Sequence, residues 1–183
     1  MSPRIAPLTL STASDTTRPL LEGLKKALGM VPQLYATIGH APGALKGLLA
    51  FGDALDQQGK LSRREVELVS LHASELNGCG YCVAAHGALA GRVGLSPEEI
   101  TAARNGHSSN LREAAILALT RRVTRTGGAQ AGTELAAARE AGLTDGEIVE
   151  VLAHAALKFF TNSVALVAQT EVDFPKQPKL PQP

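Results

Sequence analysis

A chain of 183 residues with 44% hydrophobic and 19% charged residues has the length and composition of one globular domain with a substantial core. Its net charge is +1, and its Lys and Arg residues are scattered, which argues against a nucleic-acid partner. Aromatic residues make up only 3% of the chain and Trp is absent, whereas Ala, Leu and Gly abound. This balance favours close helix packing over a β-sandwich.

No membrane-spanning segment and no secretion signal are predicted. No apolar run approaches the roughly 20 residues needed to cross a bilayer. Residues 1–20 lack a basic region followed by an apolar one. We therefore expect a cytoplasmic protein with no membrane partner. The two Cys residues stand only three positions apart, so they cannot staple distant elements, and local chemistry is their expected role.

Both ends of the chain are predicted to be extended, with a single domain over residues 15–173 between them. Residues 1–14 are polar and contain Pro, and residues 174–183 hold four of the ten prolines.

The first helices of the domain are marked by Leu spacing, Gly and Pro. A helix is expected over 17–28, where four Leu residues share one stripe and Gly29 is placed to end it. Pro stands at the expected first turn of a short helix over 32–38 and of a longer one over 42–57.

Four later helices begin with a capping-box pattern, in which an N-cap side chain and an acid three residues on satisfy free amides of the first turn. The pairs are Ser62 with Glu65, Ser96 with Glu99, Asn110 with Glu113, and Thr144 with Glu147. Gly-containing breaks fall between the predicted helices. The agreement of caps, breaks and apolar periodicity predicts an all-α fold.

Segments 61–73 and 143–155 resemble one another at an offset of 82 residues, which predicts two copies of one helical hairpin. The matched pairs include Leu61 and Leu143, Ser62 and Thr144, Glu65 and Glu147, Val69 and Val151, His72 and His154, and Ala73 and Ala155. In the second copy, Thr161, Val164 and Ala168 stand where the first copy has its two Cys residues and a His. Packing alone therefore does not demand cysteine at those positions.

Segment 61–90, LSRREVELVSLHASELNGCGYCVAAHGALA, carries the residues that point to chemistry. Gly78 breaks one helix and a second starts at about Cys79. On that helix Cys79 and Cys82 are i and i+3, and Cys82 and His86 are i and i+4, so the three side chains share a face. The helix N-terminus favours a Cys79 thiolate, and His86 can take a proton from a thiol one turn away.

Glu67 is the candidate group to orient His86. An antiparallel turn at Gly78 places Glu67 roughly 16 Å back from the turn and His86 roughly 12 Å beyond it, at about 1.5 Å per residue. A long side chain or a water can bridge this mismatch of one helical turn. The alternative from residue types alone is a surface ion pair of Glu67 with Arg63 or Arg64.

The pattern Glu-x11-Cys-x2-Cys-x3-His resembles the core signature of the AhpD-like alkyl hydroperoxidases in the carboxymuconolactone decarboxylase superfamily. The resemblance implies an all-helical bundle that assembles as a homotrimer or homohexamer and reduces hydroperoxides through a dithiol and disulfide cycle. By position it implies that Cys82 is the peroxidatic thiol, that Cys79 resolves it, and that Glu67 and His86 form a proton relay. No metal or organic cofactor is implied. A lipoyl-bearing or thioredoxin-like protein is the implied electron donor.

Two candidate pocket residues accompany this cluster. Tyr81 takes the place of a His in the family's best-studied members, which leaves the relay one group shorter. We expect Tyr81 to pack over the cysteines, with its hydroxyl available to a substrate. His40 is a candidate to border the same pocket, with a loop or cap position as its alternative.

Other interpretations of the cluster stay open. A lyase of the carboxymuconolactone decarboxylase type would use His86 as an acid or base and needs no thiols. A non-catalytic redox sensor or disulfide reductase would use the Cys pair alone. A zinc site with His72 or Glu67 as fourth ligand is disfavoured, because no second Cys or His pair exists. Buried inert thiols are the remaining alternative, and His72 and His154 are expected to be structural.

Overall fold

The computed structural model describes residues 2–180, and within them it is all-helical, with nine α-helices and no strand. The helices are α1 (Arg18–Leu28), α2 (Gln33–Ile38), α3 (Pro42–Gln58), α4 (Arg63–Leu76), α5 (Gly80–Arg92), α6 (Pro97–Arg104), α7 (Leu111–Thr126), α8 (Gly132–Glu140) and α9 (Asp145–Ala168). The predicted all-α fold is confirmed. Met1 and residues 181–183, which belong to the two predicted end segments, lie outside the described residues.

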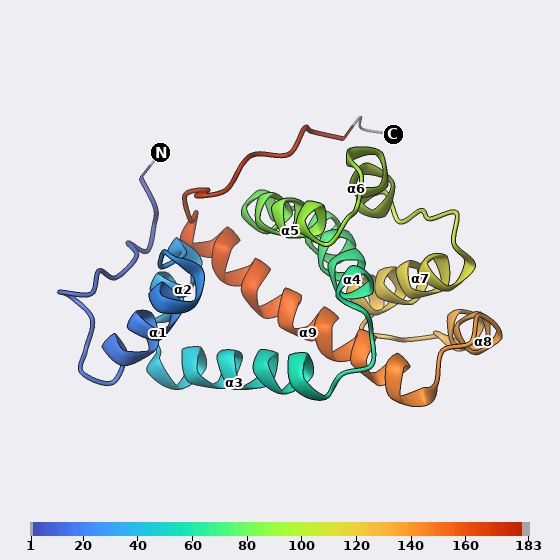
Figure 1. Ribbon diagram of the computed structural model, residues 1–183, viewed down its shortest axis with the longest axis horizontal. Helices are drawn as coiled ribbons and strands as arrows, with labels where there is room; N and C mark the ends of the chain where they lie inside the picture. Colours follow the sequence, from blue (N-terminus) through green and yellow to red (C-terminus); the bar gives the residue numbers. More distant parts are fainter. Residues whose placement is uncertain (1, 181–183) are drawn as a thin grey trace.

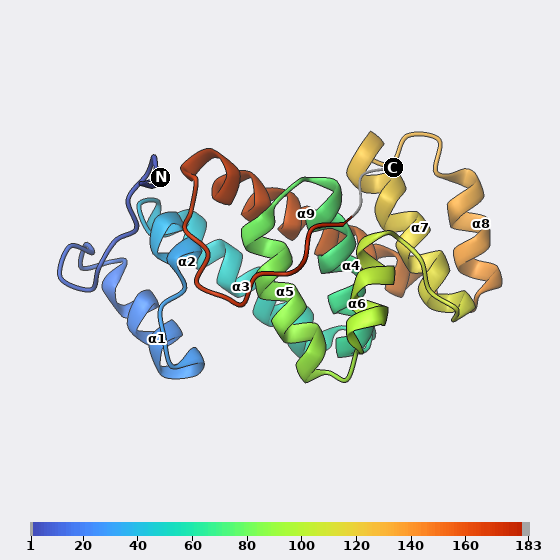
Figure 2. The same ribbon diagram turned by 90° about the horizontal axis from the view of Figure 1, so that it is seen from above.

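Helices α4 and α9 form the centre of the bundle. Helix α4 packs against α5, α6, α7 and α9, and α9 also packs against α2, α3, α5, α7 and α8. Helix α9 crosses the middle of the molecule in Figure 1, and the view in Figure 2 shows α1 and α2 at one end and α7 and α8 at the other. The apolar cluster beneath α1, α2 and α3 includes both cysteines, so the Cys pair lies in the core.

Three of the four predicted capping boxes are complete, those at Ser62, Ser96 and Thr144. The fourth is only half formed. The Asn110 side chain accepts from the amides of Arg112 and Glu113, but the Glu113 carboxylate does not return to Asn110. It accepts from Arg64 Nε and from Ser108 Oγ, both at 2.6 Å, because a cation from α4 lies within its reach.

The predicted hairpin repeat is wrong in its second copy. Helix α4 ends before Gly78, which takes a left-handed φ of +70°, and the chain then turns into α5. The matching position in the second copy is Phe160, and α9 runs through it without a break. Without a Gly to adopt the left-handed conformation there, the chain has no local reason to leave the helix.

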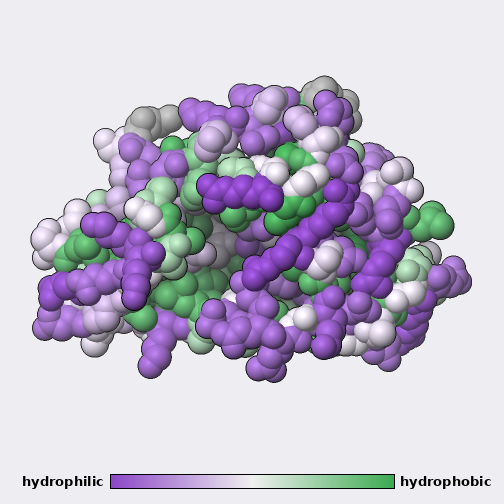
Figure 3. Space-filling view, viewed as in Figure 1, coloured by the Kyte–Doolittle hydropathy of each residue, from purple (hydrophilic) through white to green (hydrophobic). Residues whose placement is uncertain are grey.

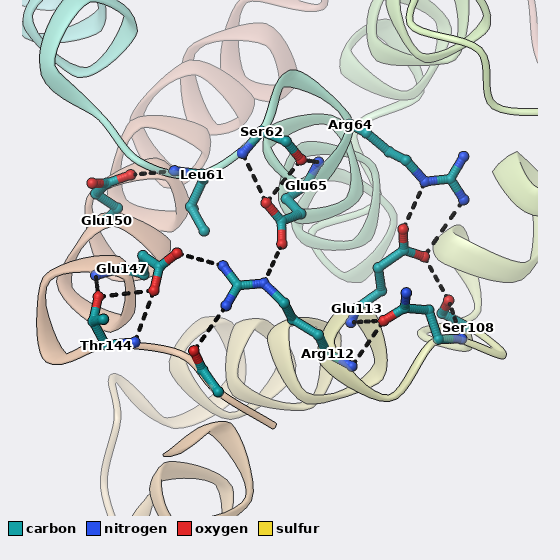
Figure 4. A network of polar contacts seen from close by, with 12 residues as sticks. Leu61, Ser62, Arg64, Glu65, Ser108, Arg112, Glu113, Thr144, Glu147 and Glu150 are labelled. Atoms are coloured by element: carbon teal, nitrogen blue, oxygen red, sulfur yellow. Dashed lines mark hydrogen bonds and ion pairs between the residues drawn. The ribbon is translucent and has the colours of Figure 1, made fainter. Parts of the chain in front are cut away.

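The first turns of the two copies nevertheless share one partner, Arg112 of α7 (Figure 4). Its Nε donates to Glu65 Oε1 at 2.7 Å, and its Nη2 donates to Glu147 Oε1. Both acids are N3 residues of capping boxes, at the starts of α4 and α9. One guanidinium thus ties together the starts of the two central helices.

Arg112→Ala should therefore destabilise the fold by about 2–4 kcal/mol, because it leaves two mostly buried carboxylates without their cation. Denaturant unfolding at pH 7 measures this. The matched control is Arg139→Ala. Among the described residues Arg139 pairs only with the exposed Asp145, so its loss should cost less than about 1 kcal/mol. Equal losses in the two variants would contradict the bridging role.

The pH dependence of the Arg112→Ala effect gives a second check. The capping hydrogen bond of Thr144 and the cation of Arg112 lower the pKa of Glu147 from 4.5 to about 2. Since the folded pKa lies below the unfolded one, this stabilisation is complete above about pH 4.5 and is lost as the pH falls toward 2. The difference between wild type and Arg112→Ala should shrink over that window.

Within residues 2–180, the segments before α1 and after α9 dock on the bundle without regular secondary structure. The Arg4 amide donates to the Ala168 carbonyl at 2.7 Å, at the end of α9. On the other side, the Arg104 guanidinium donates to the Pro178 carbonyl at 2.8 Å, and the Gln177 side chain lies directly over Gly87 of α5. Figure 2 shows the C-terminal segment running along α5 toward α6.

The prediction that no apolar segment approaches membrane-spanning length is wrong for α9, judged by length and composition alone. Helix α9 is long and apolar enough to cross a bilayer, and 39% of its most apolar stretch is buried inside the bundle. The helix lies at the centre of the bundle and contacts helices on several sides. One helix of this kind is only weak evidence for a membrane span, because core helices can pass the same test.

Candidate active site

The Cys pair lies where α4 turns into α5. Helix α5 begins at Gly80, with Cys79 as its N-cap, and the Cys79 Sγ accepts a hydrogen bond from the Cys82 amide at 3.3 Å. The two sulfurs form a disulfide, with the Cα atoms 5.4 Å apart. The exposed fractions of Cys79 and Cys82 are 1% and 3%. The predicted helix start at about Cys79 and the predicted proximity of the thiols are confirmed.

Glu67 reaches His86 directly, as the antiparallel turn predicts. Glu67 Oε2 lies 2.8 Å from His86 Nδ1, and the two side chains are only 12% and 15% exposed. Arg63 and Arg64, the alternative partners of Glu67, bind other acids. The contact joins α4 to α5 one turn beyond the cysteines.

The structure adds a residue that the sequence interpretation missed. Lys158 of α9 places its Nζ 2.8 Å from His86 Nε2. Its sequence signal is weak but present: it is the one Lys, Arg, Asp or Glu between Glu150 and Glu171, in an otherwise apolar helix. A partly buried cation in such a stretch needs a polar partner.

Burial governs the electrostatics of this cluster. It lowers the pKa of His86, with the Lys158 cation as a second cause, while Glu67 opposes the shift. It likewise lowers the pKa of Lys158, against the pull of Glu67 and Asp56. Both bases are therefore shifted toward their neutral forms, which are the forms that accept a proton.

A cavity of about 540 Å³ opens beside the cluster. It is bounded by α5, α9, the connection from α1 to α2, and the segment after α9. Its walls are largely apolar, and its polar lining includes Cys82, His86 and Lys158. Cys79 does not line it. A small molecule in this cavity would thus meet Cys82 and not Cys79.

Tyr81 lines the same cavity and belongs to the apolar cluster that holds the cysteines. Its ring packs edge-on against Phe174, with centroids 5.7 Å apart. Its hydroxyl accepts from the Leu34 amide at 3.4 Å. Burial and the carboxylate of Asp173 raise the pKa of Tyr81. The hydroxyl therefore stays protonated at neutral pH.

The prediction that His40 borders the pocket is wrong. His40 does not line the cavity, and its Nε2 lies 2.9 Å from the Ala6 carbonyl. The N-terminal segment that docks beside α2 supplies this partner, which corresponds to the alternative loop role of His40.

His72 and His154 are buried in the bundle. His72 Nδ1 lies 3.0 Å from the Arg104 carbonyl, and burial lowers the pKa of His72 to about 4. His154 is 6% exposed. Within residues 2–180, no three His, Cys, Asp or Glu side chains converge as a metal site requires.

Part of the chain matches a model of a known protein family. Residues 42–121 match the model of the carboxymuconolactone decarboxylase family. That stretch contains Glu67, Cys79, Cys82 and His86, whereas Lys158 lies outside it. No curated protein matches the sequence.

Three solved structures show the same fold. An uncharacterized peroxidase-related protein from Ralstonia eutropha JMP134, described as an alkylhydroperoxidase AhpD core, is 24% identical, with 94% of this chain and 93% of that chain covered and a TM-score of 0.83. A putative antioxidant defence protein AhpD, of unknown function, from Agrobacterium tumefaciens is 25% identical, with 75% and 96% covered and a TM-score of 0.68. The debrominase Bmp8, in complex with 2,3,4-tribromopyrrole, is 19% identical, with 92% and 91% covered and a TM-score of 0.78.

Proposed function

Because the chain belongs to the AhpD-like and carboxymuconolactone decarboxylase superfamily, we propose that it is a thiol-dependent peroxidase that reduces organic hydroperoxides. The observation that carries this proposal is the meeting of a disulfide-forming sulfur and a proton relay in one cavity. Cys82 and His86 line that cavity, and Glu67 binds His86 from outside it.

The proposed cycle starts from the reduced Cys pair. The Cys82 thiol loses its proton to the basic cluster that Glu67 and His86 belong to, and the thiolate attacks the peroxide to give a sulfenic acid. Cys79 condenses with the sulfenic acid, water leaves, and the disulfide forms. The geometry supports this order, because Cys82 lines the cavity and Cys79 lies within bonding reach behind it.

The position of Cys79 at the start of α5 also supports its role as the resolving thiol. Its position as N-cap exposes its sulfur to the first-turn amides, and one of them donates to it. Such a sulfur is a good leaving group when an external dithiol attacks the disulfide. We propose a lipoyl-bearing or thioredoxin-like protein as that reductant, in a cytoplasmic setting where thiols are kept reduced.

The test is a titration of the fully reduced protein with an organic hydroperoxide. Two thiols should be lost for each hydroperoxide consumed, and added dithiol should support many turnovers. One oxidation without turnover would support the redox sensor and count against the peroxidase. Peroxide left intact in the presence of two free thiols would rule the peroxidase out.

The lyase is the second candidate, and a specific observation favours it. His86 and Lys158 line the cavity, and with Glu67 behind His86 they form an acid–base line that would work without thiols. The matching family model is named for a decarboxylase. Activity on a lactone acid that survives alkylation of both Cys residues would establish this candidate.

We also propose that the protein assembles as a homotrimer or homohexamer. Helix α9 carries strongly exposed apolar side chains. Among them are Val149, Phe159 and Val167, whose exposed fractions are 60%, 67% and 62%. Figure 3 shows apolar side chains gathered in a hollow on the face that α9 crosses. A second copy of the chain would remove this surface from water.

Phe159→Glu should reduce the assembled mass, because it places a charge in the proposed contact surface. Light scattering after size-exclusion chromatography measures the mass of the wild type and the variant. The matched control is Lys46→Glu, at an exposed position of α3. A monomeric wild type would contradict the assembly.

A further inference from the structure

Lys158 completes a line of three polar side chains that runs from α4 through α5 to α9. Glu67 Oε2 lies 2.8 Å from His86 Nδ1, and His86 Nε2 lies 2.8 Å from Lys158 Nζ. A carboxylate only accepts hydrogen bonds, so Nδ1 carries the proton and Nε2 keeps its lone pair. An N–H of Lys158 donates to that lone pair. The imidazole therefore has no free nitrogen to turn toward a thiol.

Two members of this line meet the cavity, His86 and Lys158. Lys158 lines the same cavity as Cys82, whereas Glu67 does not. Among residues 2–180, no hydrogen bond joins His86 to either sulfur. Because Glu67 and Lys158 occupy both ring nitrogens of His86, the amine of Lys158 is the group of this line that can exchange a proton with Cys82 across the cavity.

The amine keeps its bond to His86 in both protonation states. A neutral amine donates one N–H to Nε2 and has a lone pair free for the cavity. An ammonium donates the same bond and has two further N–H groups to offer. Lys158 can therefore take up a proton and give it back without moving away from His86.

The charges around Lys158 fit this exchange. Burial lowers the pKa of Lys158, whereas Glu67 of α4 and Asp56 of α3 favour its ammonium. The pKa values of His86 of α5 and His154 of α9 are lowered by burial and then by Lys158. A desolvated lysine among neutral histidines and two carboxylates is the type of group that changes protonation state readily.

We propose that Lys158 carries the proton of the Cys82 thiol to the departing oxygen of the peroxide, while His86 and Glu67 hold its amine in place. This inference rests on the proposed peroxidase function. The neutral amine takes the thiol proton, and the thiolate attacks the terminal oxygen of R–O–OH. The S–O bond forms as the O–O bond breaks, and two electrons pass from sulfur to the peroxide. The alkoxide RO⁻ then takes the proton from the ammonium and leaves as ROH.

The test compares two oxidants that differ in their need for a proton. The alkoxide released by tert-butyl hydroperoxide needs one, whereas peracetic acid releases acetate, which does not. Single-turnover oxidation of the reduced protein is measured by stopped flow for wild type, Lys158→Met and Lys158→Arg. Lys46→Met, at an exposed position of α3, is the matched control.

In both Lys158 variants the rate with tert-butyl hydroperoxide should fall by about 100-fold, and the rate with peracetic acid by about tenfold or less. Arginine keeps the positive charge but does not give up a proton at working pH, so it should not restore the ratio of the two rates. A wild-type ratio in either folded variant would overturn the proposal. If Lys158→Met does not fold, Lys158→Arg decides the outcome alone.

A second measurement separates this proposal from the peroxidase itself. Alkylation of Cys82 by iodoacetamide is followed against pH in a Cys79→Ser background, which needs no peroxide. Adding Lys158→Met should move the alkylation midpoint to higher pH, and an unmoved midpoint would overturn the role of Lys158. If the wild type reduces neither oxidant, the proposed peroxidase function is wrong. The pH dependence of alkylation would still test whether Lys158 takes the proton of Cys82.

Discussion

Replacing Cys82 with Ser should lower peroxide turnover at least about 1000-fold, because the sulfur that receives the peroxide oxygen is lost. A Ser hydroxyl at this position stays protonated and is a far weaker nucleophile. The substitution keeps the size of the side chain, so the bundle should fold as before. Peroxide consumption in the presence of dithiol measures the effect.

Cys79→Ser is the matched variant, since it removes the other sulfur of the same pair. It should keep the first oxidation of Cys82 but lose the rapid closure to a disulfide, because Cys79 is the partner within bonding reach. One equivalent of peroxide should then give a sulfenic acid that a thiol-free probe can label. The opposite pattern, with first oxidation lost in Cys79→Ser and kept in Cys82→Ser, would exchange the two roles.

The local half of the site could be predicted from the sequence, because it depends on spacing along neighbouring helices. The intervals between Cys79, Cys82 and His86 place three side chains on one helical face. Gly78 and the distances along α4 and α5 bring Glu67 to His86, and the structure shows that contact at 2.8 Å. Capping boxes locate helix starts for a similarly local reason.

The long-range half could not be predicted, because it depends on how distant helices cross. Lys158 is separated from His86 by 72 residues, and only the course of α9 past α5 brings them together. Because α9 continues from Asp145 to Ala168 without a break, the predicted second hairpin does not form. The position of His40 depends on its contact with the Ala6 carbonyl of the docked N-terminal segment. No sequence motif in that segment indicates this contact.

Glu67→Gln should lower the plateau rate of peroxide reduction by about 100-fold, because the relay loses the charge that favours protonation of His86 and Lys158. Glutamine keeps the length of the side chain and can accept a hydrogen bond from Nδ1 through its amide oxygen. The geometry is thus preserved while the negative charge disappears. Single-turnover rates measured across pH 5 to 9 report the plateau and its acid limb.

The direction of the accompanying pH shift follows from the causes of the pKa values. Glu67 raises the pKa of both His86 and Lys158 against the lowering effect of burial. Without the carboxylate, both pKa values should fall further, so the acid limb of the rate profile should move to lower pH even as the plateau drops. Glu140→Gln, at an exposed position of α8, is the control and should leave both features unchanged. An acid limb that moves to higher pH in Glu67→Gln would show that Glu67 does not act through these two bases.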